Sequence, residues 1–378
     1  MNVASPVAVS RPGRVESFHP GWYASVMGTA IVGIVAYQNP GQVAGLEGPM
    51  RALGVAMVAL SALLAVVLGI PYVARWLRHR DAARRDFANP MLGALYATFP
   101  AGLLVLAVGV ATVGSSVMPA DGVLTLVAVL AVVGIILAVV VSVAFAVMLF
   151  SGPGVEPAAV NGAWFIPPVL MIIVPMVLVP FAGSVGTGEL GLLLAAGYGA
   201  WGVGTLLFLL VASLLYARLV FHPLPGAPLA PSIWIALGPI GVGGLVLVRL
   251  AQAGTPAWGD AAPAIGAVST IGATALWGFG LWWLAVAAAL LAGYRRRGPL
   301  PYGIGWWAFT FPLGAFTALT VALARAWHAG PIEALGAILF LGLVAAWLIV
   351  AAGTLRAVGS GAAWAPASPP AIPPGRSS

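Results

Sequence analysis

The sequence predicts an all-α integral membrane protein in which ten helices cross the bilayer as five helical hairpins. Three observations predict this class: 61% of the 378 residues are hydrophobic, only 7% are charged, and the apolar residues gather in long runs. A soluble domain carries about 25% charged residues and about 45–50% apolar ones. With a mean hydropathy of +1.06, the chain lacks the polar residues that a water-facing surface needs, which excludes a soluble globular protein.

Ten apolar segments can supply the predicted helices, because a helical span needs roughly 20 predominantly apolar residues. They lie at about 22–37, 52–74, 91–113, 124–149, 163–182, 190–216, 233–251, 264–292, 306–324 and 334–354. Residues 1–18 hold no long apolar run, so we expect a tail without a signal peptide. Residues 19–356 form the predicted membrane domain, and the Pro-, Ser- and Gly-rich residues 357–378 are expected to be a disordered tail.

Proline content divides these segments into two kinds. Seven prolines lie in odd-numbered spans, Pro100, Pro167, Pro168, Pro175, Pro180, Pro239 and Pro312, and one, Pro71, lies in an even-numbered span. A proline inside a helix removes a backbone hydrogen bond and kinks the helix. A freed carbonyl exposed to lipid costs several kcal/mol, so kinked helices belong where protein or water satisfies it. We therefore expect the odd-numbered helices to be central and the even-numbered ones to be peripheral.

A short motif repeats at the start of the odd-numbered spans. An aromatic residue is followed four or five positions later by proline in four of them: Tyr96 and Pro100, Trp164 and Pro168, Trp234 and Pro239, Trp307 and Pro312. The first span opens with Trp22 and carries Gly28 at the comparable depth. Because the even-numbered spans lack this motif, it favours five hairpins of one inner and one outer helix. The alternative is that the aromatic residues only mark the membrane interface.

The distribution of arginine predicts the orientation in the membrane. All 16 basic residues are arginine, and the net charge is +7. If the N-terminus is inside, all of them except Arg51, Arg249 and Arg325 lie on the cytoplasmic side. The positive-inside rule therefore predicts that both termini lie in the cytoplasm, and we expect a multi-pass protein of the plasma (inner) membrane. The basic charge reflects topology, so we expect no nucleic-acid partner, although Arg295–Arg297 can also contact anionic lipid headgroups.

Several kinds of chemistry are disfavoured. No Asp, Glu or His lies within a span as drawn, and the one charged residue inside a span is Arg249. Intramembrane carboxylates mark proton relays and cation pathways, so a proton pump, a cation channel and an intramembrane metalloenzyme are not expected. The chain has no cysteine, and we predict no catalytic residues, no metal site and no cofactor. Gly197, Gly199 and Gly202 spell G-x-G-x-x-G but follow no strand, so they indicate helix packing rather than dinucleotide binding.

Five stretches of the sequence together resemble one transporter family. They are HPGWYASVMGTA (19–30), FANPMLGALYATFP (87–100), NGAWFIPP (161–168), PSIWIALGPIG (231–241) and WWAFTFPLG (306–314). In this order they resemble the tellurite-resistance/dicarboxylate transporter family, which includes plant slow anion channels, yeast malate permeases and sulfite efflux pumps. The resemblance runs over roughly residues 18 to 355.

The resemblance implies ten helices as five hairpins around a pore within each protomer, with the protomers assembled as homotrimers. In channel members, a phenylalanine in an aromatic–Thr–Phe–Pro setting of the ninth helix plugs the pore. Here that setting is Phe309-Thr310-Phe311-Pro312, so Phe311 is the expected gate. The alternative is that Phe311 is one more packed or lipid-facing aromatic residue.

We therefore expect a membrane channel or transporter that passes small anions, with C4-dicarboxylates such as malate as the first candidate. The predicted pore-lining residues are Gly28, Phe99, Pro100, Pro168, Gly238, Pro239 and Pro312, since kinks and small residues let water approach the backbone. The alternatives are efflux of sulfite, tellurite or another toxic oxyanion, and a membrane scaffold or sensor that conducts nothing. An enzyme is the weakest reading.

Overall fold

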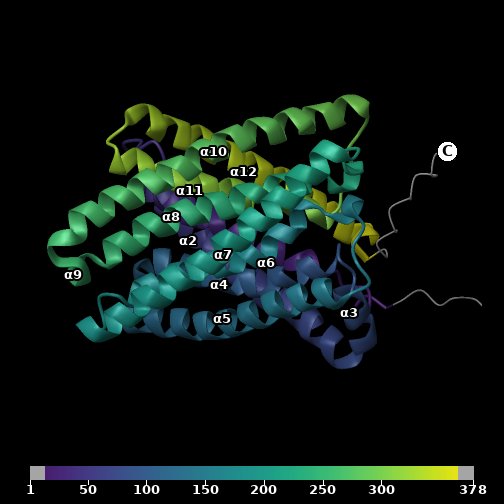
Figure 1. Cartoon of the computed structure of the whole chain (residues 1–378), viewed down its shortest axis with the longest axis horizontal. Helices are drawn as coiled ribbons and strands as arrows, with labels where there is room; N and C mark the ends of the chain where they lie inside the picture. The colour runs from purple at the N-terminus through teal and green to yellow at the C-terminus, as the bar shows by residue number, and fades with distance from the viewer. Residues whose placement is uncertain (1–12, 365–378) are drawn as a thin grey trace, which may run out of the picture.

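The computed structural model describes residues 13–364, and these residues form helices and connecting turns without a β-strand. The long helices run roughly along the long axis of the molecule, with α9 (Thr255–Trp258) at one end and α3 (Arg80–Phe87) at the other (Figure 1). The predicted all-α integral membrane fold is confirmed. Nine helical segments in the described part of the chain are long and apolar enough to cross a membrane. The first apolar segment, α1 (Ala24–Tyr37), is shorter, so the count of ten spans stays a prediction.

Five long helices form the outside of the bundle. They are α2 (Glu47–Arg78), α5 (Ala120–Ser151), α7 (Thr187–Phe221), α10 (Ala262–Arg297) and α12 (Gly330–Gly359). In their most apolar stretches only 17–28% of the residues are buried. Side chains such as Val66, Ile136 and Leu206 project from these helices with more than half of their surface exposed. In a membrane this apolar surface faces lipid.

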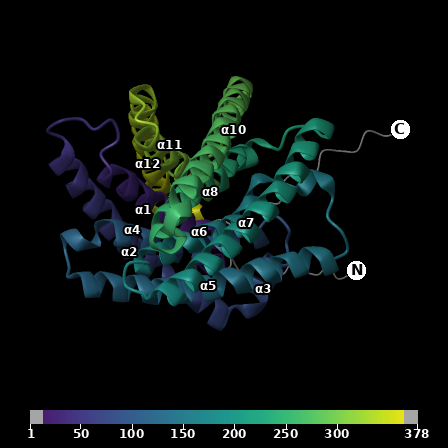
Figure 2. The ribbon, with the colours of Figure 1, turned by 60° about the vertical axis from the view of Figure 1, so that its left-hand side comes forward.

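Five shorter helices lie between them. They are α1, α4 (Thr98–Val113), α6 (Ile166–Leu178), α8 (Leu237–Ala253) and α11 (Phe311–Ala326). In α4, α6, α8 and α11, 72–83% of the most apolar stretch is buried, and every residue of α1 from Ser25 to Ala36 is buried. Figure 2 shows α1, α6 and α8 between the outer helices. The burial therefore agrees with the division into central and peripheral helices that the prolines predict.

The contacts between helices follow a regular order. Each central helix packs against the outer helix that follows it in the chain: α1 with α2, α4 with α5, α6 with α7, α8 with α10, and α11 with α12. For the first four this is the most extensive contact, whereas α11 packs most extensively against the central helix α8. The central helices also contact one another in a closed sequence, α1–α4–α6–α8–α11–α1. They therefore surround a common axis.

Close contacts between central helices depend on glycine. A Cβ atom on Gly241 would lie 2.5 Å from the backbone of Ala315, so α8 and α11 touch backbone to backbone there. A Cβ atom on Gly314 would lie 2.6 Å from the Ile31 side chain, so this side chain of α1 packs directly on the backbone of α11. Such small residues let helix backbones approach closely in membranes. Gly197 lies in α7 and faces Leu250 of α8, in agreement with helix packing.

A 3₁₀ segment precedes each of the five central helices. These segments are η1 (Pro20–Tyr23), η2 (Gly93–Ala97), η5 (Gly162–Phe165), η7 (Ala227–Ala236) and η9 (Ile304–Phe309). They contact one another in the same circular order as the helices. All five central helices therefore start at one end of the bundle, which we call the amino end, and finish at the other, the carboxyl end.

The repeated aromatic and proline residues sit at these junctions. The aromatic residue lies in the 3₁₀ segment, and the proline lies in the first turn of the α-helix, as Pro168 does in α6 and Pro312 in α11. A first-turn N–H has no partner within the helix, so proline costs no hydrogen bond there. The expectation that these prolines kink their helices is therefore wrong; they mark where each α-helix begins. Pro175 in α6 and Pro71 in the outer helix α2 are internal to their helices.

Shorter elements complete the described chain. They are η3 (Gly114–Ser116), η4 (Pro157–Ala159), η6 (Val179–Phe181), η8 (Gly259–Ala261) and η10 (Ala362–Trp364). Trp364 of η10 stacks on Trp22 at a ring distance of 5.7 Å. Helical structure thus reaches into the segment expected to be a C-terminal tail, whose residues 365–378 lie outside the described part.

Candidate functional site

The amino end of the bundle is a ring of aromatic residues supplied by the 3₁₀ segments. Hydrogen bonds from several of them tie the ring to neighbouring segments: the Trp164 indole donates to Pro90 O at 2.8 Å and the Trp307 indole to Thr354 Oγ1 at 3.0 Å. The buried indole N–H groups of Trp22 and Trp234 have no partner among the described residues. Trp234 packs edge-on against Phe309 at 5.4 Å.

Phe311, the predicted gate, is the first residue of α11 and is buried, with 6% of its surface exposed. Its ring lies against α8 at Gly238: a Cβ atom there would be 3.5 Å from Phe311 Cε1 and 3.9 Å from Pro312 Cα. Thr310 precedes it and is held by a hydrogen bond from its hydroxyl to Trp307 O at 2.8 Å. The structure thus brings Phe311, Pro312 and Gly238 together between two central helices.

Gly28 lies next to this group on the neighbouring helix α1. A Cβ atom on Gly28 would overlap Thr310 Oγ1 and would lie 2.9 Å from the Trp307 ring. Gly28 is therefore needed for the contact between α1 and the start of α11. Thr310 is a residue that sequence reasoning missed, although it lies inside the motif that singled out Phe311.

The other predicted pore-lining residues lie in different surroundings. The Phe99 ring stacks on Tyr72 of the outer helix α2 at 4.4 Å and meets Tyr23 edge-on at 4.6 Å, so it is turned toward α2. The Pro168 carbonyl is close to Gly204 of the outer helix α7. Pro100 and Pro239 are buried in the first turns of α4 and α8. Their position at the junctions is clear, and a pore-facing role remains a prediction.

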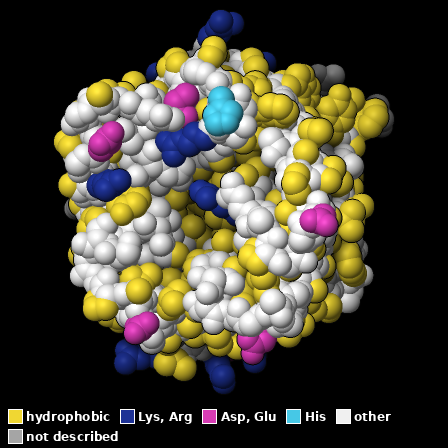
Figure 3. All heavy atoms as spheres, turned by 90° about the vertical axis from the view of Figure 1, so that its left-hand side faces the viewer, with side chains coloured by type: hydrophobic (Ala, Val, Ile, Leu, Met, Phe, Trp, Pro, Cys, Tyr) yellow, Lys and Arg dark blue, Asp and Glu magenta, His cyan; other side chains and the backbone are white. Residues whose placement is uncertain are grey.

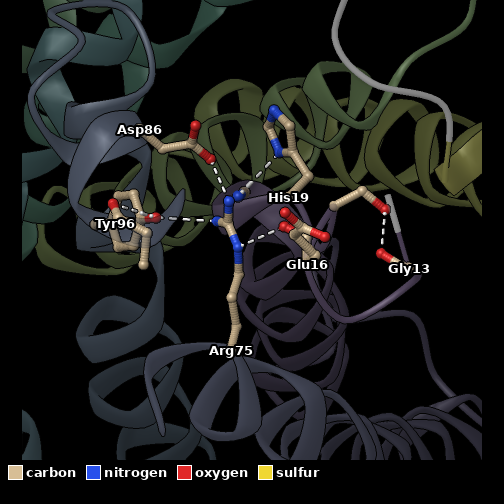
Figure 4. A network of polar contacts seen from close by, with 9 residues as sticks. Gly13, Glu16, His19, Arg75, Asp86 and Tyr96 are labelled. Atoms are coloured by element: carbon tan, nitrogen blue, oxygen red, sulfur yellow. Dashed lines mark hydrogen bonds and ion pairs between the residues drawn. The ribbon is translucent and has the colours of Figure 1, made fainter. Parts of the chain in front are cut away.

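A partly buried ion pair fastens the N-terminal segment to the amino end (Figure 4). Arg75 Nη2 lies 2.6 Å from Asp86 Oδ2, and the same guanidinium donates to Glu16 O and to the Tyr96 hydroxyl at 2.9 and 3.0 Å. The predicted span 52–74 ends before Arg75, but α2 continues to Arg78, and Arg75 is only 5% exposed. These three groups accept hydrogen bonds from the guanidinium, which compensates its burial.

His19 caps η1 beside this ion pair, because its Nδ1 accepts a hydrogen bond from Gly21 N at 3.1 Å. Burial lowers the pKa of His19 to about 4, while the nearby Asp86 raises it and Arg75 lowers it further. The imidazole is therefore neutral at physiological pH, as an acceptor nitrogen requires.

The carboxyl end carries a second ion pair. Arg325, in the last turn of α11, lies 3.5 Å from Glu333 Oε1 and donates to Gln38 O at 2.5 Å. Glu333 Oε1 also accepts from Gly41 N at 2.9 Å. Glu333 falls just outside the predicted spans, yet α12 begins at Gly330 and buries it. The helix α12 therefore contains Glu333, an acidic residue that lies just outside the predicted span 334–354.

Two cavities at this end are wide open to the surface. One of about 560 Å³ is lined by Arg325, His328 and Glu333 with neighbouring small residues, and one of about 440 Å³ is lined by Arg249, Gln252 and Thr255 with apolar residues. Figure 3 shows this face with a hollow at its centre, basic side chains in and beside the hollow, and acidic side chains around the rim. Within residues 13–364 no three His, Cys, Asp or Glu side chains come together as metal ligands.

Comparison with known proteins gives a consistent result. A family model described as "SLAC1: Voltage-dependent anion channel" matches residues 17–355. An uncharacterized transporter of Methanocaldococcus jannaschii is 31% identical over 353 residues, which is 92% of this chain and 95% of the relative. A sulfite efflux pump of Trichophyton rubrum is 28% identical, over 90% of this chain and 91% of the relative. A malic acid transport protein of Schizosaccharomyces pombe is 22% identical, over 92% and 80%.

Proposed function

We propose that this chain, which belongs to the SLAC1 family of voltage-dependent anion channels, passes small anions through the centre of its five central helices. The family membership agrees with the resemblance of the sequence to the tellurite-resistance/dicarboxylate transporters. The observation that carries this proposal is the closed sequence of contacts α1–α4–α6–α8–α11–α1. Five parallel helices around one axis offer a path that is separated from lipid by the outer helices.

Electrostatics favour anions at the amino end. A helix carries a partial positive charge at its N-terminus, and five central helices start there together. Of the 14 arginines within residues 13–364, all but Arg51, Arg249 and Arg325 lie at this end. Helix N-termini directed at a central site attract anionic groups in other transporters. An anion is therefore attracted to this entrance, and a cation is repelled.

Phe311 is the gate in this proposal. Its ring lies between α11 and the backbone of α8 at Gly238, where the opposite helix has no side chain to share the space. A phenyl ring in a narrow passage blocks it by volume and excludes water, and such constrictions can gate a channel. Gly28, Gly238, Pro239 and Pro312 would line the passage near the gate. We leave Phe99 out of the lining because its ring stacks on α2.

Two substrate classes are supported by the relatives. Malate and other C4-dicarboxylates correspond to the relative named as a malic acid transport protein. Sulfite corresponds to relatives of higher identity that are named sulfite efflux pumps. Both substrates are small oxyanions, so the same positive entrance serves either. We place the protein in the plasma (inner) membrane with both termini in the cytoplasm, in contact with lipid and assembled as a homotrimer.

Flux measurements on the purified full chain in liposomes test this function. Chloride, nitrate, sulfite, malate and succinate are presented in turn, and the reversal potential is measured with and without a pH step that leaves the charge of the anion unchanged. We expect the reversal potential to follow the anion gradient and to ignore the pH step, because no acidic side chain lies along the central helices. If none of the five anions crosses, the protein is a scaffold or sensor, and the proposal fails.

A further inference from the structure

The carboxyl end has a concentric arrangement of charge. Each outer helix begins there with an acidic residue in or beside its first turn: Glu47, Asp121, Glu189, Asp260 and Glu333. The positive end of the helix dipole accounts for an acidic residue at each of these positions. The outer ring of carboxylates thus has a structural explanation that needs no ligand.

Two arginines lie inside this ring, on adjacent central helices. Arg249 belongs to α8 and Arg325 to α11. These two helices are in register along their contact, since Gly244 packs on Leu319, and Val248 and Leu323 share a buried cluster one turn further. Arg249 follows Val248 directly and Arg325 lies two residues after Leu323, so the two arginines sit at about the same level of the bundle.

The two arginines have different surroundings. Arg325 is in the last turn of its helix, pairs with Glu333 and holds Gln38 O, so it has a structural role and its charge is compensated. Arg249 lies before the last turn of α8. Among residues 13–364 it pairs with no carboxylate, and its hydrogen bond is a long one, 3.4 Å, to Gln252 Oε1. Its charge is the uncompensated one on the central helices at this end.

Arg249 also lines a cavity. The cavity of about 440 Å³ lies between the ends of α6 and α8, with Val179, Ala182 and Gly183 on one side and Gln252, Ala253 and Thr255 on the other. Arg249 is the one ionised residue of this lining. A planar guanidinium presents several N–H donors in a geometry that matches a carboxylate or another oxyanion. The Gln252 amide can add a further donor.

We propose that Arg249 and Gln252 form an anion-binding site at the carboxyl end of the pathway, for a small oxyanion or carboxylate. The inference rests on the proposed function and adds a second anion site, distant from the gate at Phe311. The site serves a physical need, since the five central helices direct their negative C-termini at this end and repel an approaching anion. A positive charge held at this mouth offsets that repulsion.

Flux through the full chain in planar bilayers, with the anion presented at the carboxyl end, tests the site. The variants are Arg249→Gln, Arg249→Met, Arg249→Lys and the control Arg51→Gln, which removes a charge from the outer helix α2 at the same end. The anion is whichever of sulfite or malate wild type passes faster. Melting temperatures in detergent identify any variant that is misfolded. If one of the two neutral variants, Arg249→Gln or Arg249→Met, is misfolded, the other one carries the test.

We expect both neutral variants to raise the half-saturating anion concentration about fivefold, as for loss of one charge near an ion at a protein surface, with the maximal flux little changed. Arg249→Lys should stay within about twofold of wild type, and Arg51→Gln should be indistinguishable from it. The site is refuted if wild type conducts and the neutral Arg249 variants saturate as wild type does. An equal effect of Arg51→Gln would also refute it, because general surface charge would then suffice. If wild type passes no anion, the proposed function and the site fail together.

Discussion

Replacement of Phe311 by alanine distinguishes a gate from an ordinary core residue. In a sealed core, loss of a phenyl ring costs roughly 3–5 kcal/mol, because the cavity stays empty. Gly238 lies opposite and has no side chain that could move into the space. If the ring instead closes a passage, water fills the space and the loss of stability is smaller than this range. The anion flux then rises by roughly tenfold or more, which corresponds to about 1.4 kcal/mol less barrier.

Phe309→Ala is the matched control. Phe309 is two residues away and packs edge-on against Trp234 and Trp306 at 5.4 and 5.9 Å. Each such aromatic pair contributes about 0.5–1.5 kcal/mol beyond its buried area. We therefore expect Phe309→Ala to lower the free energy of unfolding without raising the flux.

The assay combines anion flux in liposomes with thermal unfolding in detergent for both variants. The gating argument is refuted if Phe311→Ala loses the full 3–5 kcal/mol of a core residue and conducts no better than wild type. If Phe309→Ala opens the pathway instead, the gate is the other aromatic residue of the motif.

Three further predictions follow from other parts of the structure. Since the chain has no native cysteine, an impermeant thiol reagent on intact cells should label Asp260→Cys and spare Arg80→Cys; the reverse pattern would invert the topology. Gly28→Ala should lower the free energy of unfolding by about 1–3 kcal/mol through overpacking, and Thr310→Ala should recover part of this loss in the double variant; simple additivity of the two changes would contradict the contact. Burial lowers the pKa of His19 from 6.5 to about 4 in the folded protein. Between these two pH values the unfolded state binds more protons than the folded state, so the melting temperature should fall as the pH is lowered through this interval. His19→Asn keeps a capping acceptor and should reduce this pH dependence; an unchanged profile would assign it to another group.

Much of the fold could be predicted because its signals are local. Long apolar runs identify helices that face lipid, and the motif that ends at Pro100, Pro168, Pro239 and Pro312 distinguishes central from outer helices. The conformational meaning of these prolines was harder to predict. Proline favours the first turn of a helix as well as kinks, and only the 3₁₀ segments before them decide between the two.

The candidate site depends on helix rotation and on distant contacts, which the sequence encodes weakly. Phe99 precedes Pro100 in the motif, yet its ring turns to Tyr72 of the outer helix α2, because rotation about the helix axis is set by packing. Arg249 has the sequence features of a side chain that reaches the membrane surface. Only the structure shows that Arg325 pairs with Glu333, whereas Arg249 pairs with no carboxylate among residues 13–364.

The most direct test of the central claim is chemical block at the centre of the five helices. Gly238→Cys is placed in the Phe311→Ala background, and the flux of the fastest anion is measured before and after a negatively charged, impermeant thiosulfonate reagent. A cysteine side chain fits at this position, because its Cβ atom makes an ordinary contact. Modification should abolish the flux, whereas modification of the exposed Asp260→Cys on the outside of the bundle should leave it unchanged. Full modification of Gly238→Cys with undiminished flux would show that anions do not cross through the centre of the helix ring.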